Sequence, residues 1–279
     1  MFDAVCPSDV PVLQRARGEL DVTLRRRGEA TVLEDLRQAG CLKARFPRGG
    51  EPGWHETVVL NSSGGVAAGD RLQLRIRVRA EARVSVAAQA AERFYRAPAG
   101  GGPAVVRGRL EVAEGAAAEW LPQETILFDG ARMDRCLEVD LAAGSWFLGA
   151  ESLIFGRAAM GETLRGGSVL DLIRLRRGGR LLLHDAVRMA GDIAALLARP
   201  ALGGGAGAVA TLVHVAPDAE SRLPVMRAAL EGAEAGASAW DGMLLVRALA
   251  PDGAKLRRIV TAALAVLRGA RSLPRVWRC

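Results

Sequence analysis

The clearest pattern in the chain is an alternation of apolar and polar positions with a period of two. It is sharpest in one segment, where Leu72, Leu74, Ile76 and Val78 alternate with Gln73, Arg75, Arg77 and Arg79. The same alternation recurs at residues 20–25 and 137–141. Because successive side chains of a strand point to opposite faces, the pattern predicts strands with one buried face and one exposed face.

Glycine-rich breaks separate these segments. They lie at residues 64–65, 100–102, 166–167, 178–179 and 203–205, and they are typical of turns and loops. Many short strands between turns predict a mainly β fold of stacked antiparallel sheets. No change in composition marks a linker and no internal repeat is found, so we expect residues 1–279 to form a single large domain.

Helical spacing is confined to the last third of the chain. Apolar residues follow one helix face at Ile259, Ala262, Ala263, Val266 and Leu267. Gly269 supplies a stop, and Arg268 is predicted to lie off the apolar stripe. A second helix is predicted to begin near Ser221 as its N-cap, with Pro224 in its first turn. Residues 243–249 are predicted to form another strand. We therefore expect two helices in the C-terminal third.

Basic residues exceed acidic ones by 38 to 31, which gives a formal charge of +7. This balance suits a nucleic acid, an anionic membrane or an acidic protein partner. The exposed side chains of Arg75, Arg77 and Arg79 would track phosphates in a nucleic-acid-binding β protein. The segment carries no aromatic platforms, however, so a solvated or protein-facing strand is the favoured interpretation.

The four cysteines, Cys6, Cys41, Cys136 and Cys279, form no CxxC pair, so they predict reduced thiols of undefined role rather than a disulfide framework or a zinc site. The N-terminal residues lack a secretory pattern, and no stretch approaches the roughly 18 apolar residues of a membrane span. We expect a cytoplasmic protein that does not bind a membrane.

Catalytic motifs are mostly lacking. The segment 203–207 lacks the lysine and hydroxyl of a phosphate-binding loop, and Ser62–Ser63 lacks the flanking glycine of a nucleophile elbow. His184 and Asp185 are adjacent, so on a strand they point to opposite faces, and we expect an uninvolved histidine beside a solvated aspartate. A hydrolase with a dispersed active site stays a rival hypothesis, but no catalytic residue is predicted.

Four ordered blocks then resemble a known family. They are residues 60–72 (LNSSGGVAAGDRL), 87–97 (AAQAAERFYRA), 119–131 (EWLPQETILFDGA) and 151–162 (ESLIFGRAAMGE), and an ending follows at 273–278 (LPRVWR). In this order and spacing the chain resembles the UreD (UreH) family of urease accessory proteins. It departs from the family at Ala87–Ala88, where Thr-Thr is common, and at Cys41–Leu42, where Pro-Leu is common.

The resemblance implies a β-rich scaffold without catalytic activity. Such a scaffold binds the urease apoprotein and the helical accessory protein UreF, and through UreF the GTPase UreG. It implies no tightly bound cofactor. Nickel would instead be in transit through a water-filled tunnel on its way to urease during metallocentre assembly.

Carboxylates within the blocks are candidates for the polar path. Glu151 and Glu162 lie among small and apolar residues, and Asp70, Glu92, Glu124 and Asp129 are the predicted candidates for transient contact with nickel. Carboxylates without thiols or histidines suit a weak, exchangeable divalent site. The alternative is structural, with Asp70 capping a turn and the others paired with neighbouring arginines.

Overall fold

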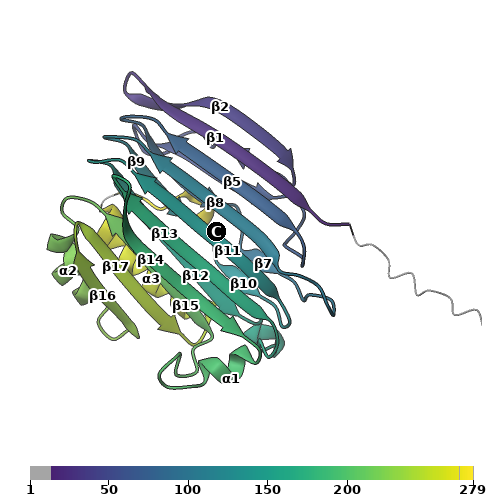
Figure 1. Cartoon of the computed structure of the whole chain (residues 1–279). Helices are drawn as coiled ribbons and strands as arrows, with labels where there is room; N and C mark the ends of the chain where they lie inside the picture. The colour runs from purple at the N-terminus through teal and green to yellow at the C-terminus, as the bar shows by residue number, and fades with distance from the viewer. Residues whose placement is uncertain (1–13, 270, 279) are drawn as a thin grey trace, which may run out of the picture.

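The computed structural model describes residues 14–269 and 271–278, and these form two stacked β-sheets with the last two helices on one outer side (Figure 1). The seven-stranded sheet contains, in chain order, β1 (Arg17–Arg27), β2 (Ala30–Gly40), β5 (Arg71–Val78), β8 (Ala104–Val112), β11 (Arg132–Leu141), β13 (Ser168–Arg177) and β14 (Arg180–Ala190). The ten-stranded sheet contains β3 (Leu42–Arg45), β4 (His55–Asn61), β6 (Arg83–Ala88), β7 (Glu92–Phe94), β9 (Ala117–Leu121), β10 (Thr125–Leu127), β12 (Trp146–Phe155), β15 (Ala208–Val215), β16 (Ala235–Trp240) and β17 (Met243–Ala250). The mainly β prediction is confirmed.

The middle of each sheet is parallel. In the seven-stranded sheet β5, β8, β11 and β13 are parallel neighbours, and in the ten-stranded sheet β4, β6, β9 and β12 are. The chain crosses from one sheet to the other between these strands, so neighbours within a sheet are not joined by hairpins. The antiparallel pairs are β1–β2 and β13–β14 at the two edges of the seven-stranded sheet, and β3–β4, β12–β15, β15–β17 and β16–β17 toward the two ends of the ten-stranded sheet. The antiparallel prediction is therefore wrong for the middle, because alternation reports which face is buried and carries no information on strand direction.

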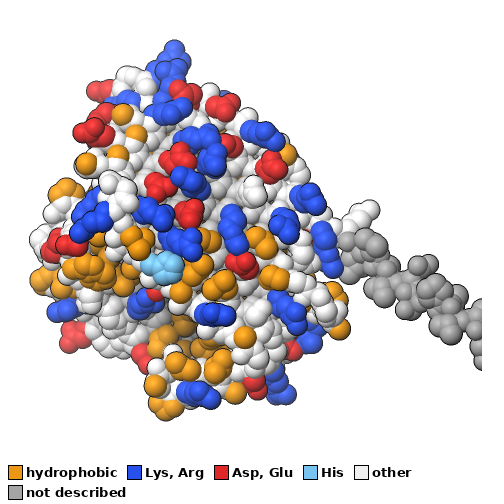
Figure 2. Space-filling model, in the orientation of Figure 1, with side chains coloured by type: hydrophobic (Ala, Val, Ile, Leu, Met, Phe, Trp, Pro, Cys, Tyr) orange, Lys and Arg blue, Asp and Glu red, His pale blue; other side chains and the backbone are white. Residues whose placement is uncertain are grey.

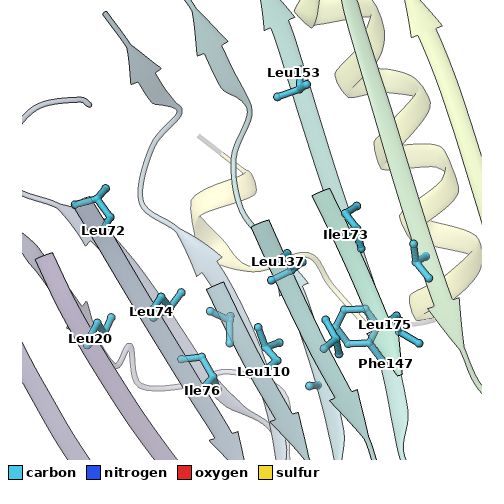
Figure 3. Packing of buried hydrophobic residues seen from close by; sticks show 14 of the residues in the cluster. Leu20, Leu72, Leu74, Ile76, Leu110, Leu137, Phe147, Leu153, Ile173 and Leu175 are labelled. Carbon is cyan, nitrogen blue, oxygen red and sulfur yellow. The ribbon is translucent and has the colours of Figure 1, made fainter. Parts of the chain in front are cut away.

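The main hydrophobic core fills the space between the two sheets. Figure 3 shows Leu74, Ile76 and Leu110 from the seven-stranded sheet in the same layer as Phe147 and Leu153 from the ten-stranded sheet. The alternating residues of 72–78, 20–24 and 137–141 supply inward apolar side chains, as predicted. Burial of this apolar surface is the main stabilising contribution to the stacking.

A second core lies between the outer face of the ten-stranded sheet and the helices Leu223–Ala229 and Gly253–Arg268, whereas the helix Ile193–Leu197 packs on the core between the sheets. The helical elements are α1 (Ile193–Leu197), α2 (Leu223–Ala229) and α3 (Gly253–Arg268), with short 3-10 turns η1 (Ala158–Met160), η2 (Glu220–Arg222) and η3 (Arg275–Trp277). The buried stripe of α3 is formed by Leu256, Val260, Ala263, Leu264 and Leu267. These side chains pack against the outward residues of β12, β15 and β17.

The helix predictions are confirmed in outline and corrected in detail. Gly269 ends α3 with a φ of 61°, as expected. The buried stripe of α3 is rotated from the predicted one, and Arg268 is buried, because it has a carboxylate partner on the sheet below. Ser221 is not an N-cap: it lies within η2, and α2 begins at Leu223. The predicted strand at 243–249 is β17.

Charged side chains of both signs alternate on the face seen in Figure 2. The predicted arginine row is paired across strands: Arg75 with Glu111 at 4.0 Å, Arg77 with Asp21 at 2.8 Å and Arg79 with Glu34 at 2.9 Å. A surface in which carboxylates neutralise each arginine is a poor phosphate track. No helix among the described residues is long and apolar enough to cross a membrane.

His184 and Asp185 point to opposite faces of β14, as predicted. The aspartate is buried rather than solvated, because it turns into the space between the sheets and pairs there with Arg247 of β17. Cys41 and Cys136 are free thiols. Cys6 and Cys279 lie outside the described residues.

Candidate functional site

A cavity of about 210 Å³ lies between the two sheets. One wall comes from β5, β8 and β11, and the opposite wall from β4, β6, β7, β9 and β12. Most of the lining is apolar, and its polar side chains include Asn61, Gln89, Glu92, Gln123, Thr125, Arg135 and Glu151. All four sequence blocks contribute to these walls, although they are far apart in the chain.

Backbone pairing brings the blocks together at the cavity. The short strand β10 of the third block pairs in parallel with β7 of the second block on one side and with β12 of the fourth block on the other. The first block joins the second through a bridge between Val66 and Phe94. The blocks therefore form one contiguous structure around the cavity.

The Gly64–Gly65 turn explains why glycine occurs in the first block. Gly65 has a φ of 142°, and a Cβ there would stand 2.5 Å from the ring of Tyr95. The Tyr95 hydroxyl donates a hydrogen bond of 2.6 Å to the carbonyl of Gly64. Because only glycine tolerates both the backbone conformation and the ring contact, this turn fixes the first block against the second.

Glu92 is the one predicted nickel-path carboxylate that lines the cavity. It begins β7, and the Asn61 amide nitrogen lies 3.4 and 3.3 Å from its two carboxylate oxygens. Burial raises the pKa of Glu92, an effect opposed by the hydrogen bond from Asn61. A divalent cation beside this side chain would favour its ionised form.

The other cavity acid, Glu151, belongs to a buried ion-pair network. Arg135 Nη1 lies 2.8 Å from Glu151 Oε2, and Arg135 Nη2 lies 2.6 Å from Asp171 Oδ2. Arg135 also donates to Thr125 Oγ1 at 2.9 Å, and Trp120 Nε1 donates to Glu151 Oε1 at 2.7 Å. Every group of the network thus has at least one charged or hydrogen-bonded partner inside the protein.

Asp70 and Asp129 have structural contacts outside the polar lining. Asp70 is buried and accepts backbone hydrogen bonds from Ala16 at 2.8 Å and Ala67 at 2.7 Å. Asp129 pairs with Arg96 and accepts from two backbone amides, and hydrogen bonds from the Gly166 amide foremost lower the pKa of Asp129. Both therefore hold turns of the blocks.

Glu124 anchors the C-terminal end of the chain. Its carboxylate lies 2.9 Å from Arg257 of α3, whose guanidinium stacks 4.8 Å from the ring of Trp277. The Trp277 indole donates to the Leu121 carbonyl at 2.9 Å, and Gln123 donates to the Val276 carbonyl at 2.7 Å. The ending at 273–278 is thereby docked on the third block.

No group of three or more histidine, cysteine or acidic side chains is gathered into a metal cage within residues 14–269 and 271–278. Ala87 and Ala88, where the chain departs from the family pattern, line the cavity as small apolar walls. Glu162 lies apart and pairs with Arg157 at 2.8 Å.

Sequence reasoning did not single out Arg135 or Asp171. Both occupy inward positions of strands whose other inward residues are apolar, such as Met133, Leu137 and Val169. A charged residue at an inward position of an alternating strand is the signal that would have found them, because such a residue needs a buried partner.

The fold and the cavity define a β scaffold in which parallel crossovers build a mostly apolar chamber with a few polar side chains from four separated sequence blocks. The family model described as UreD urease accessory protein matches residues 16–278. The chain belongs to the UreD family of urease accessory proteins.

Relatives with the name urease accessory protein UreD are similar over nearly their whole length. The chain is 50% identical to that of Xanthobacter autotrophicus over 266 residues, covering 95% of this chain and 90% of the relative. It is 47% identical to that of a Methylobacterium species, with 90% of each chain covered. The relative from Dinoroseobacter shibae is 46% identical, with 98% of this chain and 96% of the relative covered.

Proposed function

We propose that this protein is a non-enzymatic scaffold of urease maturation that lets nickel pass through the cavity between its sheets. It binds the urease apoprotein and UreF, and through UreF the GTPase UreG, in the cytoplasm. The family membership supports the role in urease maturation, and the cavity supports the passage of an ion. Nickel is cargo in this scheme, and no resident cofactor is needed.

The observation that carries the proposal is the position of Glu92. Its carboxylate lies in the wall of a cavity assembled from all four family blocks, and its pKa is raised by burial in a mostly apolar surrounding. A carboxylate whose partners are the Asn61 side-chain amide and the Arg93 backbone amide offers oxygen ligands without the geometry of a permanent site. Weak, exchangeable contact is what a transit path requires.

The other candidate carboxylates support assembly in this proposal. Asp70 and Asp129 fix turns of the first and third blocks, and Glu124 fixes the C-terminal ending. Their amide variants are expected to act through the stability of the scaffold rather than through attraction of the ion. This divides the four predicted residues into one path residue and three structural ones.

The test is co-expression with the urease subunits and the accessory proteins in a host without urease. Glu92→Gln removes the negative charge and keeps the side-chain volume, so the complex should co-purify while the purified urease contains less than half of the normal nickel and has proportionately lower activity. Nickel is measured by elemental analysis and assembly by pull-down.

Glu124→Gln is the matched control, because the Glu92 amide bonds to the Glu124 carbonyl at 3.0 Å while the Glu124 side chain points toward α3. Its urease should carry normal nickel whenever the complex forms. Full nickel in the urease made with Glu92→Gln would refute the proposed path. Normal urease activation without this chain would refute the accessory role altogether.

A further inference from the structure

Polar side chains cross the apolar core beyond the cavity. Arg135 and Asp171 are adjacent in register on β11 and β13, and both point inward from the seven-stranded sheet. From the opposite sheet Glu151 and Thr211, also register partners, point toward them. A core made otherwise of apolar side chains is therefore interrupted by one polar layer.

A second, much smaller cavity lies in this layer. Its volume is about 10 Å³, the space of about one water molecule, and its polar lining consists of Glu151, Asp171, Asp185 and Thr211. Glu151 lines both cavities. Arg135 lines the large cavity and bonds to two of the three acids of the small one, Glu151 and Asp171. Its guanidinium therefore links groups of the two cavities.

Acidic and basic groups are not equal in number in this cluster. One guanidinium faces two carboxyl groups, so the acidic groups exceed the basic ones by one. Burial raises the pKa of Glu151; Arg135 opposes this effect and Asp171 adds to it. For Arg135, burial would lower the pKa, but Asp171 and Glu151 together raise it. The arginine thus stays charged, and the acids share a single counter-ion.

A divalent cation in the large cavity would meet Glu92 and then Glu151. We propose that Arg135 is a displaceable latch. A divalent cation binds the Glu151 carboxylate and breaks its ion pair with Arg135, while the guanidinium keeps its hydrogen bonds to Asp171. Arg135 binds Asp171 through two nitrogens, at 2.8 and 2.6 Å, and Glu151 through one. The bond to Glu151 is therefore the one that a cation would break. This inference rests on the proposed passage of nickel through the large cavity.

The latch also accounts for the lack of a metal cage in the described part of the chain. A closed set of carboxylates would hold the ion, whereas an arginine that competes for one of them shortens its stay. Farther along the layer Asp185 pairs with the half-exposed Arg247. The polar layer therefore extends from the large cavity to a half-exposed arginine.

The test uses titration of Ni²⁺ into the full chain, held in solution with its co-expressed partners. Arg135→Met with Asp171→Asn removes one charge of each sign and leaves Glu151 without its counter-ion. The affinity for Ni²⁺ should rise at least tenfold relative to the wild type, and adding Glu151→Gln should abolish the gain. A folded double variant with wild-type affinity, or a gain that survives Glu151→Gln, would overturn the latch.

The matched control is the buried pair of Glu119 and Arg268, which lies on the outer side of the ten-stranded sheet, away from the cavity. Glu119→Gln with Arg268→Met should leave the affinity for Ni²⁺ unchanged. If the inner double variant does not fold, Arg135→Lys serves in its place. A lysine cannot bridge both acids as the guanidinium does, so the affinity should rise severalfold, and an unchanged affinity would again overturn the latch.

Failure of the latch and failure of the proposed function give different results. Unchanged Ni²⁺ affinity in the Arg135 variants, together with low nickel in the urease made with Glu92→Gln, contradicts only the latch. Full nickel in the urease made with Glu92→Gln contradicts the proposed path itself. A change in Ni²⁺ affinity upon mutation of Arg135, with urease maturing normally, would place the ion site off the delivery route and so overturn both.

Discussion

Two buried arginine clusters lie on opposite sides of the ten-stranded sheet, and they differ in the sign of their excess charge. The inner cluster has one arginine, Arg135, with Glu151 and Asp171. The outer cluster has one carboxylate, Glu119, with Arg268 and Arg271 at 2.9 and 2.7 Å. A carboxylate without an arginine of its own can attract a cation into a neighbouring cavity. An arginine without a carboxylate of its own can instead donate hydrogen bonds to backbone carbonyls and stack on aromatic rings.

The outer cluster uses its excess charge to hold the end of the chain. Arg268 donates to the carbonyl of Ser272, and the Arg271 guanidinium lies 3.9 Å from the ring of Trp54 and 5.4 Å from that of Trp146. These contacts fix the turn that follows α3 and carries the docked ending. The comparison indicates that similar residue types serve assembly on one side of the sheet and, in our proposal, passage on the other.

The largest expected effect is at Glu119. Glu119→Gln removes the carboxylate that the buried Arg268 shares with the half-buried Arg271, and breaking such a buried pair costs about 3–5 kcal/mol of the free energy of unfolding. Denaturant unfolding followed by circular dichroism measures this. As a control, Glu111→Gln on the exposed arginine row should cost under about 1 kcal/mol. Equal losses in the two variants would contradict the comparison.

Acid should lower the stability of the protein through His214, which lies on the outer side of the ten-stranded sheet. Burial foremost, with nearby Arg222, lowers the pKa of His214 to about 4, below the ordinary value of 6.5, and the ring lies 5.1 Å from that of Trp146. Because the unfolded state then binds more protons, stability falls as the pH drops from about 6.5 toward 4, by about 2 kcal/mol at pH 5.

The measurement is the free energy of unfolding at pH 7.5 and at pH 5. His214→Leu removes the titrating group, so the variant should lose about 2 kcal/mol less than the wild type between these two pH values. A wild type and variant with the same pH dependence would show that His214 does not control the acid response of this side.

The smallest effect is expected in the inner cluster. Asp171→Asn leaves Arg135 paired with Glu151 and removes the repulsion between the two acids, so the free energy of unfolding should change by about 1 kcal/mol or less. The same unfolding assay as for Glu119→Gln applies. A loss as large as that of Glu119→Gln would mean that the inner acids are not in excess, and the contrast between the clusters would fail.

The sequence predicted the strands well because their signal is local. A period of two fixes which side chains share a face, and this identified the inward residues of β1, β5 and β11. It did not predict parallel pairing, since each crossover connects strands of different sheets. It also placed Arg268 on the exposed side of α3, because a helix stripe read alone does not show that Glu119 lies beneath it.

The candidate site was predicted only at the level of the blocks. The resemblance identified residues 60–72, 87–97, 119–131 and 151–162, and all of them contribute to the walls of the cavity. Among their acids it did not separate Glu92 from Asp70, Glu124 and Asp129. That separation depends on which neighbours each carboxylate meets, and those neighbours come from distant parts of the chain.

By itself the sequence determined the family, the strand faces and the glycine turns, because each of these depends on residues close together in the chain. Only the tertiary structure decided that Arg135 meets Glu151 and Asp171, and that Glu92 faces a cavity while Glu124 faces a helix. The physical reason is that the direction of a side chain is set by local backbone geometry, whereas its partner is set by the crossovers that stack the two sheets.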